Sequence, residues 1–308
     1  VLTPKLSTRA VSEADNSKSV TAEGDATVTD YVRYTGLTAG QTYTLTGTLM
    51  DKSTKKAFED ADGNPVTATA VFTAEAESGT ATVTFTFDAS GIKTGTKLVA
   101  FETVATNGIE IADHKDINDI DQTVTVKAPV IGTTAVDAAD GDKTGTGEEN
   151  VSVRDTVHYN NVTPGKTYKV SGTLYEKVTD KDGKVSKKQL LDADGNPVTA
   201  ETEFVPDDTY GTVDVTFTFD ASDLKAKDKV VAFESLSLNG KELASHADIE
   251  DKSQTVTITK PTLSTTAVDG LDADKNLIGE GDVTIVDTVK YKNVTPGKTY
   301  KVSGTLYE

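Results

Sequence analysis

The sequence of 308 residues contains no cysteine and no tryptophan, and it has only three histidines and one methionine. The lack of cysteine excludes disulfides, thiolate metal sites and cysteine nucleophiles. No apolar run approaches the roughly 20 residues needed to cross a bilayer. Residues 1–10 have neither the charged start nor the apolar centre of a signal peptide. We therefore expect any secretion or anchoring signal to lie outside this sequence.

Basic residues are also scarce. Lysine and arginine number 31 against 49 aspartates and glutamates, so the net charge is −18. Nucleic acids and anionic membranes are bound through basic surfaces, so the composition excludes nucleic acid as a partner and argues against membrane contact. The hydrophobic fraction of 36% is that of a globular chain, and the length suits two or three domains.

Internal repetition indicates how the chain is divided. Residues 161–176 recur without change at 293–308, and residues 83–90 recur at 215–222. We predict two complete domains and an incomplete third, with boundaries at 1–127, 128–260 and 261–308. The linkers around residues 128 and 260 are short, so the domains are expected to form a stiff rod.

Within each repeat the apolar residues alternate with polar ones, and threonine, valine, tyrosine and phenylalanine dominate. This period of two is typical of an all-β sandwich, and no stretch has a helical period. Asn107-Gly108 and Asn239-Gly240 each separate two alternating runs, which predicts two-residue hairpin turns.

Several polar residues interrupt the apolar faces of the expected strands. Gln122 shares a face with Val124 and Val126, in a strand expected to span residues 121–126. A buried polar group without a partner costs about 1–3 kcal/mol, so such a residue needs an explanation. The same alternation places the following residues on inward faces: Thr8, Asp30 and Glu102 in repeat one, Thr133, Asp155, Glu234 and Gln254 in repeat two, and Thr265 and Asp287 in repeat three.

Two of the three histidines occupy equivalent positions. His114 and His246 each lie eight residues before the glutamine and twelve after the glutamate, whereas His158 lies on an outward polar face. A hydroxyl is a nucleophile once it loses its proton, and an amide carbonyl is an electrophile. Two adjacent carboxyl groups keep one proton near neutral pH, which can polarise the carbonyl and protonate departing ammonia. The set therefore predicts an ester between the first and last strands of a domain.

The motifs themselves resemble a known family. The V-A-F-E sequences at 99–102 and 231–234, together with H-x-D-I-x-D-x-x-Q at 114–122 and 246–254, are similar to the VaFE-repeat, Thr-Gln ester-bond domains of Gram-positive surface adhesins. The resemblance implies immunoglobulin-like domains whose ester cross-links form autocatalytically. Among the assisting residues, we assign Asp and Glu to a proton-sharing pair and His to positioning and polarisation. The implied esters are Thr8 to Gln122, assisted by Asp30, Glu102 and His114, and Thr133 to Gln254, assisted by Asp155, Glu234 and His246. Repeat three keeps Thr265 and Asp287 but lacks counterparts of the glutamate, the histidine and the glutamine.

These features favour a structural shaft segment of an extracellular adhesin, anchored to the cell wall by a part outside this sequence. We expect single-turnover self-cross-linking rather than enzyme turnover, and no cofactor or metal. The expected partners are neighbouring repeats, with any host ligand bound by a tip domain elsewhere. A ligand- or carbohydrate-binding module without a cross-link is the alternative, but the loops lack clustered aromatic residues. A hydrolase is disfavoured because the candidate residues face a core.

Overall fold

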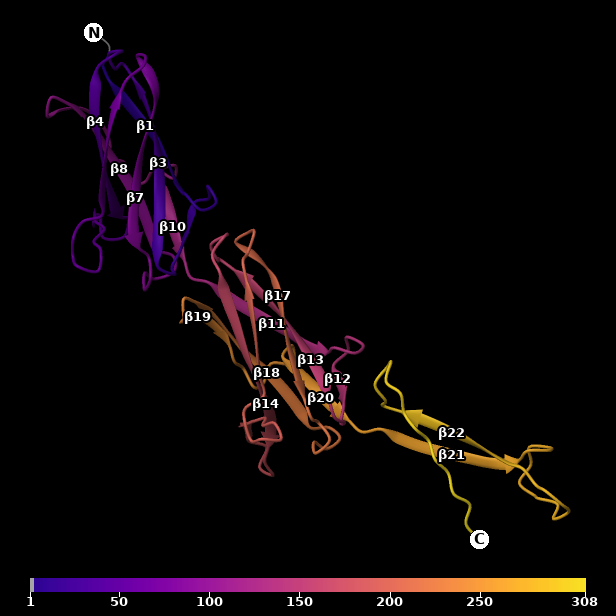
Figure 1. The fold of residues 1–308 in the computed structure, drawn as a ribbon. Coiled ribbons are helices and arrows are strands. Elements are labelled where there is room, and N and C mark those ends of the chain that lie inside the picture. Colours follow the sequence, from indigo (N-terminus) through magenta and orange to yellow (C-terminus); the bar gives the residue numbers. More distant parts are fainter. Residues whose placement is uncertain (1–2) are drawn as a thin grey trace.

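The computed structural model describes residues 3–308, which form three bodies arranged in line (Figure 1). None of these residues is helical, and none therefore belongs to a helix able to span a membrane. The prediction of tandem all-β, immunoglobulin-like domains is confirmed.

Domain 1 consists of two sheets that pack face to face. One sheet has the strand order β1-β3-β7 and the other has the order β2-β10-β8-β4-β5, with β6 also paired to β4 and β9 to β8. The strands are β1 (Lys5–Ser12), β2 (Ser19–Thr21), β3 (Asp25–Thr35), β4 (Thr42–Asp51), β5 (Lys56–Ala57), β6 (Thr67–Thr73), β7 (Ser78–Asp88), β8 (Lys97–Thr106), β9 (Ile109–His114) and β10 (Thr123–Lys127).

Domain 2 repeats this topology strand for strand. Its sheets have the orders β11-β13-β17 and β12-β20-β18-β14-β15, with β16 on β14 and β19 on β18. The strands are β11 (Val130–Asp137), β12 (Thr144–Thr146), β13 (Val151–Asn160), β14 (Tyr168–Thr179), β15 (Val185–Gln189), β16 (Thr199–Phe204), β17 (Tyr210–Phe219), β18 (Lys229–Leu238), β19 (Lys241–His246) and β20 (Thr255–Thr259).

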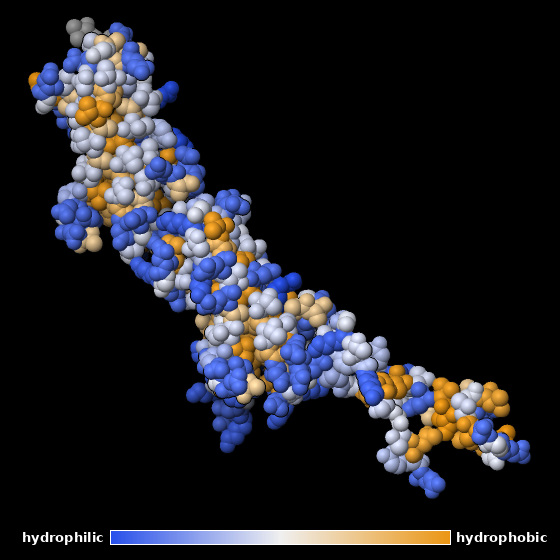
Figure 2. Space-filling model, viewed as in Figure 1, coloured by the Kyte–Doolittle hydropathy of each residue, from blue (hydrophilic) through white to orange (hydrophobic). Residues whose placement is uncertain are grey.

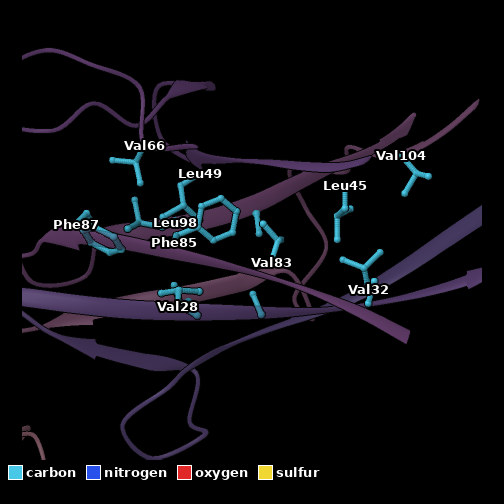
Figure 3. Packing of buried hydrophobic residues seen from close by; sticks show 14 of the residues in the cluster. Val28, Val32, Leu45, Leu49, Val66, Val83, Phe85, Phe87, Leu98 and Val104 are labelled. Carbon is cyan, nitrogen blue, oxygen red and sulfur yellow. The ribbon is translucent and has the colours of Figure 1, made fainter. Parts of the chain in front are cut away.

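The inward faces of the two sheets form a dry core. Phe85, Leu49 and Leu98 pack between the sheets of domain 1 and are inaccessible to solvent (Figure 3). Gly47 lies opposite Glu102 in the pairing of β4 with β8. A Cβ atom at Gly47 would lie 2.4 Å from Phe85 Cζ, so the glycine makes room for this ring beside the buried glutamate.

The hairpin turns follow the sequence-based prediction. Asn107 and Gly108 have φ angles of 51° and 77°, and Asn239 and Gly240 have φ angles of 51° and 79°. Two consecutive left-handed residues define the tight turn whose twist matches antiparallel strands. These turns fold β9 back on β8 and β19 back on β18, which brings each histidine opposite the glutamate of the same hairpin.

The expected strand over residues 121–126 needs one correction. β10 begins at Thr123, so Gln122 lies in the turn just before it. The backbone of this turn bonds in two directions: Ala10 N–H donates to Asp121 O at 2.8 Å, and Ala100 N–H donates to Gln122 O at 3.0 Å. These bonds connect the end of the turn to both sheets while Gln122 stays on the inward face.

Repeat three contributes β21 (Thr262–Asp269) and β22 (Ile285–Lys292), which pair with each other as an antiparallel ribbon. Apolar side chains gather on this part of the surface (Figure 2), among them Leu263 at 64% exposure and Val286 at 47%. The ribbon has the register of β1 with β3 and of β11 with β13.

Candidate functional site

Five predicted side chains meet between the two sheets of domain 1. Thr8 comes from β1, Asp30 from β3, Glu102 from β8 and His114 from the end of β9, and Gln122 precedes β10. Asp30, Glu102 and Gln122 are fully buried, and Thr8 is 7% exposed. In domain 2 the equivalent residues Thr133, Asp155, Glu234 and Gln254 are likewise buried, with His246 beside them. The fold therefore brings each predicted set together.

The glutamine amide points its nitrogen at the glutamate. Gln122 Nε2 donates to Glu102 Oε2 at 2.8 Å and to the backbone oxygen of His114 at 3.2 Å. In domain 2, Gln254 Nε2 donates to Glu234 Oε2 at 3.2 Å and to the backbone oxygen of His246 at 2.9 Å. The group that must leave as ammonia thus contacts a carboxyl group in both domains.

The two carboxyl groups form a pair that retains a proton. Burial, together with the adjacent Asp30, raises the pKa of Glu102 to about 10. Burial also raises the pKa of Asp30, while the neighbouring Glu102 and Thr8 side chains act to lower it. Glu234 and Asp155 show the same pattern, with the pKa of Glu234 raised to about 10. Near neutral pH the glutamate therefore carries the proton of the pair.

In domain 2 the histidine contacts the nucleophile. In domain 2, Thr133 N–H donates to His246 Nδ1 at 3.2 Å, and Thr133 Oγ1 lies 3.4 Å from the same nitrogen. Because Nδ1 accepts the backbone hydrogen bond, the ring proton is assigned to Nε2. In domain 1, Thr8 Oγ1 and His114 Nδ1 are both buried and make no hydrogen bond of normal geometry.

An aspartate that the sequence analysis did not assign to the site orients each histidine. His114 Nε2 lies 3.3 Å from Asp119 Oδ2, and His246 Nε2 lies 3.1 Å from Asp251 Oδ2. Both aspartates belong to the H-x-D-I-x-D-x-x-Q motif, which was the available signal. In domain 2 the two ring nitrogens of His246 therefore lie beside Thr133 and Asp251.

The sequence analysis also did not assign a lysine that lies next to the site in each complete domain. Lys18 Nζ donates to the backbone oxygens of Ala10, at 2.6 Å, and of Asp121. Lys143 likewise bonds the backbone oxygens of Ala135 and of Ser253, the latter at 2.6 Å. Each lysine thus ties the threonine-bearing strand to the residue just before the glutamine. Its recurrence eight residues after an alanine, and again at Lys275 after Ala267, was the signal that could have revealed it.

Repeat three holds the remaining two predicted residues. Thr265 pairs with Val289, and Asp287 pairs with Ala267, and both side chains are exposed on the ribbon. Within residues 3–308 no glutamate, histidine or glutamine is brought to them in the way seen in domains 1 and 2.

One acidic cluster among the described residues has the spacing of a metal site. Asp269, Asp272 and Asp274 lie together in the turn after β21. Their carboxylates accept hydrogen bonds from the backbone N–H groups of Leu271, Asp274 and Asn276. The cluster therefore already has a role in closing the turn.

An immunoglobulin-like sandwich with a buried threonine, glutamine, two carboxyl groups and a histidine defines a class of domain built for internal acyl transfer. The family model described as "T-Q ester bond containing domain" matches residues 4–126, 129–258 and 261–308. The chain belongs to this T-Q ester bond domain family.

Solved structures and curated proteins were also compared. A bacterial adhesin from Mobiluncus mulieris, described as containing intramolecular disulfide, isopeptide and ester bond cross-links, is 15% identical, with a TM-score of 0.36 over 94% of this chain and 99% of that one. The C-terminal domain of the Streptococcus pyogenes antigen I/II-family protein AspA is 12% identical, with a TM-score of 0.36 over 84% of this chain and 100% of that one. No curated protein matches the sequence.

Proposed function

We propose that this chain is a shaft segment of a bacterial cell-surface adhesin, located outside the cell, in which ester bonds join Thr8 to Gln122 and Thr133 to Gln254. The observation that carries the proposal is the burial of nucleophile, amide and carboxyl pair together, between the first and last strands of both complete domains. Membership of the T-Q ester bond family supports it. The further attachment of the parent protein to a cell wall is part of the same proposal.

The contacts suggest how the ester forms. Thr133 Oγ1 attacks the side-chain carbonyl carbon of Gln254 while His246 Nδ1 accepts the hydroxyl proton, and Asp251 stabilises the resulting imidazolium. The carboxyl pair delivers its proton to the amide nitrogen, which contacts Glu234. The C–N bond breaks, ammonia leaves and the C–O bond of the ester remains. Thr8, Gln122, His114, Asp119 and Glu102 take the same roles in domain 1.

The same burial explains why the reaction runs once. The threonine and the glutamine belong to the chain itself, and both are consumed, so no site remains for turnover. The finished ester lies in a core without access for water, which protects it from hydrolysis. Every reacting group is a side chain of the domain, so the proposed chemistry calls for no cofactor.

The positions of the two bonded residues suit a load-bearing role. Tension enters domain 1 through β1, which carries Thr8, and leaves it through β10, which directly follows Gln122. An ester between them transmits the force directly and removes the intervening residues from the load path. Without it, unfolding one domain would release roughly 3.3–3.6 Å for each of about 115 residues.

Intact mass spectrometry tests the proposal. Each ester expels one ammonia, so the folded chain should be lighter than its sequence mass by two ammonias. Tandem spectra of a digest should show Thr8 and Thr133 peptides joined to those of Gln122 and Gln254. A folded chain with the full sequence mass would contradict the proposal and leave a binding module without cross-links.

A further inference from the structure

Domains 1 and 2 meet at one buried acidic side chain. Glu23 lies in the turn between β2 and β3 of domain 1 and contacts domain 2. Its side chain is only 1% exposed. The groups that bind its carboxylate come from domain 2: the Tyr168 hydroxyl donates to Oε2 at 2.5 Å, and Lys166 Nζ lies 3.2 Å from Oε1.

The second junction has the same construction. Glu148 occupies the equivalent turn between β12 and β13. The Tyr300 hydroxyl donates to its Oε2 at 3.0 Å, Lys298 Nζ donates to Oε1 at 2.9 Å, and the Thr295 hydroxyl also donates to Oε1. Burial acts to raise the pKa of Glu148, but these three donors outweigh burial and hold the pKa below its ordinary value. The acid therefore meets repeat three as a carboxylate.

The receiving tyrosine is oriented by its own domain. Thr163 N–H donates to the Tyr168 hydroxyl oxygen at 2.8 Å, and Thr295 N–H donates to that of Tyr300 at 2.8 Å. This bond occupies the oxygen as acceptor and leaves the phenol hydrogen to donate outward. Domain 1 has the same internal bond, from Thr38 N–H to Tyr43 at 2.9 Å. The orientation thus belongs to the domain fold and precedes contact with the acid.

The linker is held by the same turn. Asn161 and Asn293 adopt left-handed φ angles of 60° and 57°. Their Nδ2 groups donate to the linker oxygens of Ala128 and Lys260, each at 3.0 Å. The equivalent position in domain 1 is Gly36, and the position of Lys166 is Gln41. The asparagine and the lysine are therefore present in the two turns that bind a glutamate, and both are replaced in the equivalent turn of domain 1.

A buried carboxylate is costly unless it is paired, and charge-assisted hydrogen bonds are directional. Only one placement of the second domain therefore satisfies the acid. We propose that the turn Thr-Pro-Gly-Lys-Thr-Tyr, at residues 163–168 and 295–300, is a docking site for the glutamate of the repeat before it, and that this contact sets the angle and rotation between successive domains. Its partner is a T-Q repeat with a glutamate seven residues before the site aspartate. Glu280, seven residues before Asp287, extends the pattern to repeat three. The inference does not depend on the ester.

The test measures the interdomain geometry of the full chain. The native chain lacks cysteine, so spin labels can be placed at Thr84→Cys and Thr216→Cys, equivalent exposed positions on β7 and β17. Double electron–electron resonance should give one narrow distribution of the distance between the two spin labels in the otherwise unaltered chain. Glu23→Ala, Lys166→Met and Tyr168→Phe should each broaden the distribution and shift its mean.

Matched controls separate docking from folding. Tyr43→Phe removes the same internal bond in domain 1, where no acid among residues 3–308 is bound. Glu13→Ala removes an exposed glutamate near the junction. Both variants should leave the distribution unchanged. Intact mass reports on the ester in the same samples, so failure of the ester and failure of docking are distinguishable. Distributions for Glu23→Ala and Tyr168→Phe that match those of the controls would overturn the proposal.

Discussion

Glu102 Oε2 accepts a hydrogen bond from Gln122 Nε2 at 2.8 Å, and neither side chain is exposed to solvent. The pair joins the strand that carries the acid to the turn that carries the amide. A carboxyl group that keeps its proton in this position can deliver it to the nitrogen that must depart. The contact therefore links the burial of the site to its chemistry.

Loss of either bonded residue should remove one cross-link only. Thr8→Ala or Gln122→Ala is expected to abolish the ester of domain 1 while that of Thr133 and Gln254 remains, because each domain has its own complete site. Closing a loop of about 115 residues stabilises by roughly 4–5 kcal/mol on the chain-entropy model, so domain 1 should then melt well below domain 2. Tandem mass spectrometry checks which ester is lost, and calorimetry compares the melting temperatures of the two domains. Loss of both esters from one substitution would contradict independent sites.

Protonation of Glu102 should make the stability of domain 1 depend on pH before the ester forms. The folded-state pKa of about 10 exceeds the ordinary value of 4.5, so between these pH values the folded form holds an extra proton. In Thr8→Ala, which cannot form the ester, the stabilisation is complete below the ordinary pKa and is lost as pH rises toward about 10. The slope is at most about 1.4 kcal/mol per pH unit for one proton.

Hydrogen exchange of domain 1 peptides, followed by mass spectrometry, measures this slope. The double variant Thr8→Ala, Glu102→Gln has no titrating group at this position and should lose most of the dependence. In the otherwise native chain, Glu102→Gln alone should slow or prevent ammonia loss. An unchanged slope in the double variant would show that Glu102 is ionised in the folded domain.

The aspartate behind the histidine should affect the rate rather than the fold. Asp251→Asn removes the carboxylate that lies 3.1 Å from His246 Nε2. The imidazolium formed during attack then lacks its counter-charge, so the ester of domain 2 should form more slowly. Tandem mass spectrometry of digests taken at successive times after synthesis measures this delay, with the ester of domain 1 in the same molecule as the reference. Equal rates in both domains would assign Asp251 to loop structure alone.

Lys18 should position the reacting strands. Lys18→Met keeps the length of the side chain but removes both hydrogen bonds, to the backbone oxygens of Ala10 and Asp121. Leaving such acceptors unpaired costs about 1–3 kcal/mol each, so domain 1 should be less stable and its ester should form more slowly. Lys115→Met, which removes an exposed ammonium near His114, is the control. Equal ester yields and melting temperatures in the two variants would rule out a positioning role.

The sequence alone determined which residues face the core, because strand alternation is local. The alternation of apolar and polar residues along the strands placed Thr8, Asp30, Glu102 and Gln122 on inward faces. All four side chains are buried in the structure. The paired left-handed turns at Asn107-Gly108 and Asn239-Gly240 followed from residue type, since asparagine and glycine tolerate positive φ.

Only the tertiary structure decided which atoms meet. His246 contacts Thr133 across 113 residues, and Tyr168 contacts Glu23 across 145. Lys18 and Asp251 acquire their roles only after two sheets stack and a hairpin folds back. Alternation assigns a side chain to a face, but contacts between distant segments depend on how the sheets and the domains are placed against one another. The physical reason is that strand periodicity is set by each residue's own backbone, whereas long-range pairing is set by the packing of the whole core.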